Sequence, residues 1–558
     1  MLKNVTIYQP NSLIIPNSMA VRRVNSRPNE FIYKDYAEDY AKKYDNTTIF
    51  YDVFKTDNKI YLIGPPLLNL SSILQECYAF DESGKAIKVE IKSKQLERTQ
   101  LSWIDISIDT PEFERLRFDF SVFDNTLLEE EGKFTYVDIG KDFNDTLNGS
   151  KALMTLQLDN KLEWISDWAV YYQSIHRVDT VILYDNGSTS YKVQDIVDSL
   201  KDVPGLVNII VVQWNFKYGP QGMPWSGPNT PWDSDFCQIG ALQQMRFRFS
   251  LKSKGFINTD IDELIIPLCG IDIFEALENS DTGVIGVEGN TIEGNISNSA
   301  KLDDIPRFYH YWETKELKRG GTIKWAGTPK KWNDERIQVT AHWVRNIKYD
   351  LDKRFSIGHF NRINNGWKVK SRAEENVKID IPLRVDFALV SALKRAFPNN
   401  ISNETVVDLL CNAERKIQAI NSNSISFQNA LQSNIVLTTE RVIPWNKKWI
   451  WRENVLVFEV ITSCNQVAFD IFHSSDFIQI QLSVRDAKDF NKLSDLLSRN
   501  KSSISILNNK QGFMISKRSK KEFRSFEDIA RYCRETILDH YEIIKKNPKK
   551  LWKDMLKG

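Results

Sequence analysis

Paired cysteines are missing from this sequence. Its six cysteines lie far apart, and no two have the CxxC spacing of a zinc knuckle or a redox-active disulfide. Scattered cysteines of this kind favour a reduced, cytoplasmic protein. The cysteines are Cys77, Cys237, Cys269, Cys411, Cys464 and Cys533.

Long apolar runs are missing too. No stretch approaches the ~20 apolar residues that a membrane-spanning helix needs. The first 18 residues lack the continuous apolar segment of a secretory signal peptide. We therefore expect a cytoplasmic protein that is soluble or peripheral to a membrane.

There is no excess of one charge either. The chain has 74 basic and 73 acidic residues, which gives a net charge of +1. Proteins that bind nucleic acid normally have a basic excess, so we expect no nucleic-acid partner. No internal repeat stands out, and 558 residues suggest two to four ordinary domains.

Three regions differ in pattern. Residues 1–150 contain short apolar runs between polar turns, which predicts a β-rich accessory domain of structural or acceptor-related role. Residues 376–558 mix helical and strand patterns, which predicts an α+β domain. Residues 151–375 lie between them and form the predicted catalytic domain.

The central region alternates strands with helices. Apolar strands are predicted at 153–158, 178–184 and 206–212, and helices at 163–175 and 191–200. This alternation indicates βαβ units on a parallel, Rossmann-type sheet, so the expected class is α/β. Ligands of such sheets bind at the carboxyl ends of the strands.

A further helix is predicted to begin at Asp233 or Ser234 and to end at Gly255. It leads directly into the next apolar stretch. Arg246 and Arg248 lie on this helix, and we interpret them as part of a solvated face because charged residues are mostly exposed.

Three carboxylates interrupt the apolar stretch from Gly255 to Pro267. We interpret this stretch as one buried strand. Asp260, Asp262 and Glu263 would repel one another unless a divalent cation lay between them. Mg²⁺ and Mn²⁺ take oxygen ligands and often connect one or two carboxylates to substrate phosphates. A solvated polar corner is the alternative interpretation.

Downstream residues supply further candidates. His359 is the first choice for an additional metal or phosphate ligand and His342 the second, with a structural histidine as the alternative for each. Lys324 and Trp325 belong to a segment of alternating basic and aromatic residues that suits phosphates and sugar rings, although buried anchors would look the same. The remaining substrate-binding candidates are Arg362 and Trp367.

The order of these motifs resembles glycosyltransferases of the GT-A fold. The segments are TLQLDNKLEW, VILYDNGST, FINTDIDELIIP, HWV and HFNRINNGWK, and they are most similar to bacterial family 2 and family 92 enzymes. The resemblance covers about residues 151–370. It depends on motif order, on strand-end placement and on the about 75 residues between DNGS and DID.

This resemblance implies a GT-A-like mixed sheet of Rossmann type and a metal-dependent transferase that uses Mn²⁺ or Mg²⁺. Asp185 and Asn186 of the DNGS turn would contact the nucleotide of the donor. Asp260 and Asp262 would contact ribose, diphosphate and metal. The implied partners are a nucleotide-sugar donor and an oligosaccharide or lipid-linked glycan acceptor, in bacterial capsule or lipopolysaccharide synthesis.

Transfer with inversion would need a base to deprotonate the acceptor. The candidates are Glu263, Asp334 and Glu335. Two other functions stay open. One is a nucleotide-sugar phosphotransferase or nucleotidyltransferase on a similar sheet, and the other is a non-catalytic carbohydrate-binding protein.

The lysine-rich tail at residues 547–558 is a candidate membrane contact. If the tail is helical, Leu551, Trp552, Met555 and Leu556 fall on one side, with lysines flanking them. This pattern is typical of a helix that lies on an anionic membrane, here the inner face. A tail that is solvated or packed on its own domain is the alternative.

Overall fold

The structure is a computed structural model of the chain. It describes residues 3–24, 37–123, 133–220, 234–268, 270–293, 305–315, 322–332, 334–366 and 383–402, and shorter segments between 405 and 537.

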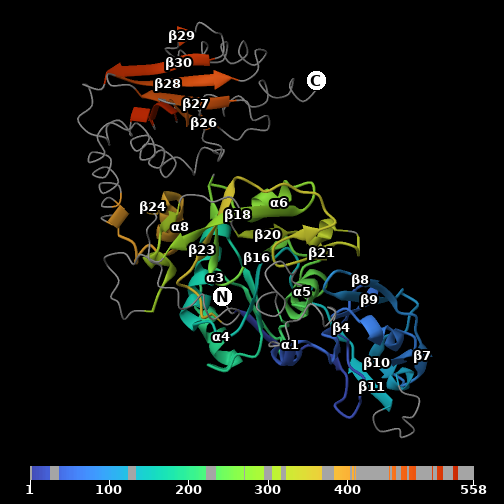
Figure 1. The fold of residues 1–558 in the computed structure, drawn as a ribbon. Coiled ribbons are helices and arrows are strands. Elements are labelled where there is room, and N and C mark those ends of the chain that lie inside the picture. Colours follow the sequence, from blue (N-terminus) through green and yellow to red (C-terminus); the bar gives the residue numbers. More distant parts are fainter. Residues whose placement is uncertain are drawn as a thin grey trace.

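A large mixed sheet lies at the centre of the described residues (Figure 1). Nine of its eleven strands are, in spatial order, β1 (Asn4–Tyr8), β15 (Asn208–Gln213), β14 (Thr180–Asp185), β13 (Lys151–Gln157), β16 (Gly255–Asn258), β20 (Ile323–Gly327), β18 (Val284–Glu293), β19 (Glu313–Lys315) and β24 (Leu383–Val385). The first five run parallel to their neighbours, and β20 is antiparallel to β16 and β18. The other two, β17 (Glu263–Pro267) and β23 (Phe355–Phe360), pair with each other, and β23 also pairs with β18.

The three strands and two helices predicted between residues 153 and 212 are confirmed as β13, β14 and β15 with α3 (Leu162–His176) and α4 (Val193–Lys201). Each strand is apolar almost throughout, because both faces of the parallel part are covered. The expected α/β class with a mixed sheet is therefore confirmed.

Helices cover the two faces of this sheet separately. On one face α3 and α4 pack together with α6 (Ile273–Glu278) and α8 (Phe387–Ala396) over Leu153 and Leu183. On the other face α5 (Phe236–Gln244) and the π-helical turn η5 (Met245–Phe249) pack over Met154 and Ile182. The alternation of side chains along β13 and β14 divides the core in this way.

The stretch from Gly255 to Pro267 is not one strand, as predicted, but two. β16 ends at Asn258, and β17 begins at Glu263 beside a different partner, β23. The turn between them holds Asp260 and Asp262. Carboxylates are costly to bury inside a sheet, and the turn places these two at its edge.

The N-terminal region is rich in strands, as its pattern predicts. One sheet contains β12 (Gly140–Lys141), β4 (Asp52–Lys55), β5 (Lys59–Gly64), β9 (Gln100–Asp105) and β8 (Lys92–Gln95). A second contains β11 (Phe134–Asp138), β10 (Phe113–Asp119), β6 (Cys77–Asp81) and β7 (Ala86–Lys88). Shorter elements are β2 (Leu13–Ile14), β3 (Thr48–Phe50), α1 (Ala37–Lys43) and the 3₁₀ turns η3 (Leu68–Leu74) and η4 (Phe120–Val122).

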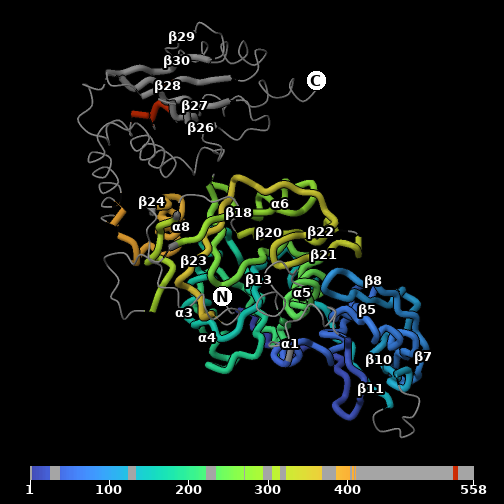
Figure 2. Tube along the Cα trace, in the orientation of Figure 1, coloured from blue at the N-terminus to red at the C-terminus, as the bar shows by residue number. Residues whose placement is uncertain are grey.

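This region is tightly joined to the central sheet (Figure 2). β1, the first strand of the chain, pairs with β15, so residues 4–8 do not follow the predicted division at residue 150. Arg248 of η5 lies 2.7 Å from Asp52 of β4, and both side chains are buried. Arg246 is buried as well, so the interpretation of these two arginines as a solvated face is wrong.

The C-terminal region contains an antiparallel sheet in the order β25 (Trp451–Arg452), β26 (Val455–Glu459), β27 (Val467–His473), β28 (Phe477–Val484), β30 (Gly512–Ser519) and β29 (Ser505–Ile506). The tail at 547–558 lies outside the described residues. Among the helices that the structure describes, none has the length and apolar character to cross a membrane.

Candidate active site

The turn between β16 and β17 forms the centre of the candidate site. The Asp260 N–H donates to a carboxylate oxygen of Glu263 at 2.9 Å, and the Glu263 N–H donates to the Asp260 carbonyl at 3.1 Å. These bonds fix the turn. Asp260 is the most exposed of its carboxylates at 29%, against 14% for Asp262 and 2% for Glu263.

β23 brings a histidine to this turn. His359 is the register partner of Glu263, and its Nε2 lies 3.2 Å from Oδ2 of Asp262. The Asn364 amide donates to the same oxygen at 3.1 Å. Ligand atoms of Asp262, Glu263 and His359 all lie within 4.8 Å of one another, so these residues could hold a metal ion.

A buried lysine lies on the other side of the turn. Lys324 of β20 has no exposed side-chain surface, and its Nζ lies 2.9 Å from Asp260 and 3.1 Å from Glu263. β20 reaches this place because it pairs with β16, where Trp325 is opposite Asn258. The ammonium group therefore offsets part of the negative charge of the three carboxylates.

The pKa values of Glu263 and His359 are both raised, but for different reasons. Burial raises the pKa of Glu263, although the Lys324 ammonium opposes the rise. Burial alone would lower the pKa of His359, but the Asp262 carboxylate and the other acids of the turn raise it to about 9. The imidazole must lose its extra proton before it can bind a metal.

The donor set fits the expected metal. Two carboxylates and an imidazole suit Mn²⁺, whereas Mg²⁺ prefers oxygen ligands and water. Asp262, Glu263 and His359 would each supply one ligand atom. The predicted ligand Asp260 is paired with Lys324 and lies outside this group.

Asp185 lies at the carboxyl end of β14, on the same edge of the sheet as the acidic turn, because β13 runs parallel to both β14 and β16. Its carboxylate is 3% exposed and accepts hydrogen bonds from Gln157 and from the hydroxyl and N–H of Ser188. Burial raises its pKa, and the Ser188 bonds oppose the rise. In this structure Asp185 fixes the turn that follows β14.

Asn186 and Asn365 position the loops at this edge. The Asn186 amide donates to the carbonyls of Trp214 and Phe216 at 2.7 and 2.8 Å, which ties the segment after β15 to β14. The Asn365 amide donates to the Leu158 carbonyl at 2.7 Å, which draws the loop after β23 across the end of β13.

Other residues that the sequence predicts for the site have buried side chains or are not part of the metal-binding group. Trp325 is fully buried and donates its indole N–H to the Thr340 carbonyl, so its ring offers no face to a substrate here. His342 is exposed, contacts the Ile323 carbonyl and is not part of the metal-binding group. Arg362 is exposed, and Trp367 lies outside the described residues.

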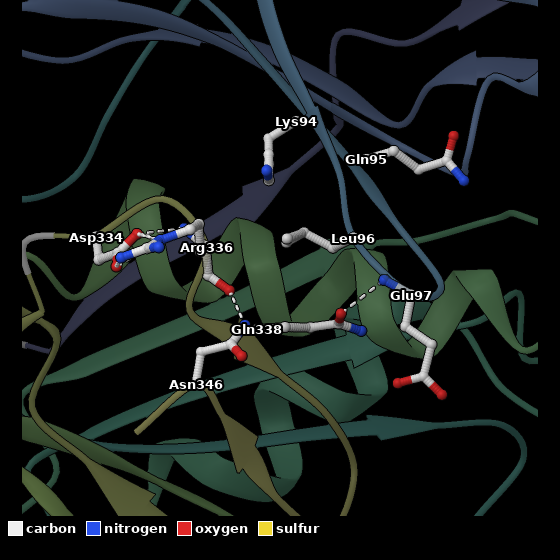
Figure 3. A pocket seen from close by; sticks show the side chains of 8 residues that line it. All are labelled: Lys94, Gln95, Leu96, Glu97, Asp334, Arg336, Gln338 and Asn346. Atoms are coloured by element: carbon white, nitrogen blue, oxygen red, sulfur yellow. Dashed lines mark hydrogen bonds and ion pairs between the residues drawn. The ribbon is translucent and has the colours of Figure 1, made fainter. Parts of the chain in front are cut away.

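Asp334 and Glu335 are engaged at the contact with the N-terminal region. Asp334 holds Arg336 in a bidentate pair, and Glu335 lies 2.5 Å from Lys59. Asp334 and Arg336 line an open pocket of about 550 Å³ between the end of β8 and the hairpin of β21 (Gln338–Val339) and β22 (Val344–Arg345) (Figure 3). The metal-binding group does not line this pocket.

The sequence does not single out Gln157 as a site residue, and it indicates Asn364 only as part of the HFNRINNGWK segment. Gln157 ends the apolar strand β13, so the strand-end rule that found Asp185 could have found it. Asn364 follows β23 in a loop, and no local pattern connects it to an aspartate 102 residues earlier.

Comparisons with known proteins add little. No family model matches the chain, and no curated protein matches it. A solved structure with some similarity is that of S. aureus TarS, at 11% sequence identity and a TM-score of 0.23. The match covers 60% of this chain and 64% of that one.

Proposed function

We propose that this protein is a metal-dependent glycosyltransferase that moves a sugar from a nucleotide-sugar donor to a glycan acceptor. The observation that carries the proposal is the cluster of Asp262, Glu263 and His359 at the carboxyl edge of a parallel sheet. Ligands of open α/β sheets bind outside this edge. Asp185 at the end of β14 lies on the same edge, where the nucleotide would be bound.

Each side chain has a distinct part in this proposal. Asp262, Glu263 and His359 would hold the ion, and a bound divalent cation would supply positive charge for the nucleoside diphosphate leaving group. Asp260 is the most exposed carboxylate and contacts the ribose and diphosphate end of the donor. Lys324 keeps Asp260 and Glu263 in place. Glu263 is too buried to reach an acceptor hydroxyl, which argues against it as the base.

We also propose the setting that the resemblance implies, which is the synthesis of a bacterial surface polysaccharide such as capsule or lipopolysaccharide. The acceptor would be an oligosaccharide or a lipid-linked glycan. The enzyme would act in the cytoplasm, with a peripheral contact at the inner face of the membrane.

The test is a screen of nucleotide sugars with the full-length protein, with and without Mn²⁺, that measures release of nucleoside diphosphate. Asp262→Asn removes a metal ligand and should lower the rate by more than about 100-fold while the fold is retained. Asp198→Asn is the matched control because Asp198 lies on α4, is about half-exposed and pairs with Lys201 of the same helix.

Full activity of Asp262→Asn, or activity in excess chelator, would contradict the metal-dependent mechanism. Release of nucleoside monophosphate or pyrophosphate would indicate a phosphotransferase or nucleotidyltransferase. No turnover of any donor, with or without Mn²⁺, would favour a carbohydrate-binding protein.

A further inference from the structure

The second N-terminal sheet, β11-β10-β6-β7, has an unusual outer face. One face packs Leu116, Phe118 and Ala79 into the core. The other face would normally be polar, because antiparallel sheets commonly bury only one side. Here it carries aromatic rings and arginines instead. This aromatic–arginine face consists of Tyr78, Phe80, Arg115, Arg117, Phe134 and Tyr136.

The two arginines lie between the rings. Arg115 is opposite Phe80 in the register, and its guanidinium is 5.5 Å from that ring and 5.1 Å from Tyr136. Arg117 is opposite both Tyr78 and Tyr136, and its guanidinium is 4.6 Å from Tyr78 and 4.5 Å from Phe134. Such stacking fixes the guanidinium planes and leaves their N–H edges to bind anions.

The face keeps unused binding capacity. Within the described residues neither arginine forms an ion pair, and Nε of Arg117 is buried without a hydrogen-bond partner. Tyr136 is 48% exposed. Among the described residues the neighbouring acids include Asp138, the register partner of Arg115, Glu76, which pairs with Lys88, and Asp119, which accepts from Ser121. Folding therefore accounts poorly for one exposed and three half-buried rings that hold two cations.

We propose that the aromatic–arginine face binds an anionic glycan chain. Exposed rings stack on the apolar faces of sugars, and a guanidinium fork matches a carboxylate or phosphate. Arg115 and Arg117 are two residues apart on one strand, so they would hold anionic groups ~7 Å apart. The choice of a glycan rests on the proposed function, since the acceptor or product chain needs a holding site. Nucleic acid is the less favoured occupant because the chain lacks a basic excess.

The test uses native gels cast with hyaluronan, in which every second sugar carries a carboxylate, and gels cast with neutral dextran, without donor or metal. Hyaluronan should retard the full-length protein, and dextran should retard it less. Arg115→Gln with Arg117→Gln should raise the apparent dissociation constant for hyaluronan at least tenfold. Lys42→Gln with Lys201→Gln removes the same charge from exposed helices and should leave it unchanged.

Two further single variants distinguish a loss of glycan binding from a loss of folding. Arg115→Gln and Tyr136→Ala each change an exposed side chain, and each should weaken retardation about threefold without lowering the melting temperature. Asp262→Asn should be retarded like the wild type, so loss of transfer and loss of glycan binding are separate results. Retardation that is unchanged in the double arginine variant, absent in the wild type, equal in dextran, or stronger with oligothymidylate would overturn the proposal.

Discussion

At the scale of single residues, His176 shows how completely burial can decide a protonation state. It lies at the end of α3, and the structure buries it fully. Nε2 lies 2.8 Å from the Ile265 carbonyl, and Nδ1 accepts the Ile273 N–H at 3.3 Å. Burial lowers the pKa of His176 to about 4, although the bond to Ile265 opposes the change. The folded protein therefore holds a neutral imidazole.

His176 should make the fold sensitive to acid. Its folded pKa lies below its unfolded value, so its full contribution to stability is present above pH ~6.5 and is lost as the pH falls towards 4. The expected loss is about 3 kcal/mol. Urea unfolding at several pH values in this window should show a shallower pH dependence for His176→Gln than for the wild type. Parallel pH profiles for the two proteins would rule this contribution out.

Lys324 and Glu263 should be strongly coupled. Lys324→Met leaves a carboxylate that is 2% exposed without its cation and should lower the free energy of unfolding by about 3–5 kcal/mol. Glu263→Gln in the same chain removes the stranded charge and should recover part of that loss. A double-mutant cycle in chelator measures the coupling directly. Additive effects of the two substitutions would show that the pair is not an energetic unit.

Several site residues were predictable one at a time from the sequence. Asp260, Asp262 and Glu263 interrupt an apolar stretch, and a divalent cation among these clustered acids stays a prediction. The neighbours of these residues were not predictable. Lys324 is 64 residues away from Asp260, and its role as an internal counter-ion depends on the pairing of β20 with β16. The alternation of basic and aromatic residues favours Trp325 as a ring for sugar binding, but strand alternation turns that ring into the core.

At the scale of elements, the pairing of β18 with β23 controls where His359 lies. Gly289 of β18 is opposite Ile357, and a Cβ there would lie 2.0 Å from the Ile357 carbonyl oxygen. A backbone oxygen cannot move out of the way as the end of a flexible side chain can. The close approach of these strands thus requires a glycine.

Gly289→Ala should push β23 away from β18 and with it move His359 from Asp262. We expect a loss of stability of about 1–3 kcal/mol and weaker binding of Mn²⁺, measured by calorimetry. Gly358→Ala on the facing strand is the matched control, because its Cβ would first meet the Ile292 side chain at 3.1 Å. Equal Mn²⁺ affinities for the two variants would contradict this account of how His359 is positioned.

Element prediction succeeded where the pattern is local. The strands and helices from β13 to β15 have apolar runs and helical spacing that can be read within a dozen residues. It failed for Arg246 and Arg248 in η5, because their environment is supplied from far along the chain. Asp52, which binds Arg248, is 196 residues away, and one face of a helix cannot reveal such a partner.

At the scale of the molecule, the N-terminal region and the central sheet are mutually dependent. Asp52 binds Arg248, and Arg98 lies 2.7 Å from Asp235 across the same contact. Removal of residues 1–150 would remove Asp52 and Arg98. The buried side chains of Arg248 and Asp235 would then lack the groups that pair with their charges. Unpaired buried charges are strongly destabilising.

A fragment that starts at Lys151 should therefore fail to fold. We expect the fragment to be insoluble or to unfold without a cooperative thermal transition. In the full chain the same residues should unfold cooperatively. Circular dichroism and limited proteolysis of the two proteins provide the comparison. A soluble fragment with a cooperative transition near that of the full chain would show that the N-terminal region is an independent accessory domain.

The pairing of β1 with β15 also constrains the timing of synthesis. Tyr8 and Val212 are register partners, although 204 residues separate them. Ribosomes add roughly 5–20 residues per second, so the first strand waits roughly 10–40 seconds for its neighbour to be made. Val5 and Ile7 are over two-fifths exposed even in the finished sheet. During that interval the nascent chain presents an unpaired apolar strand at residues 4–8, which is a target for a holdase chaperone that binds such segments.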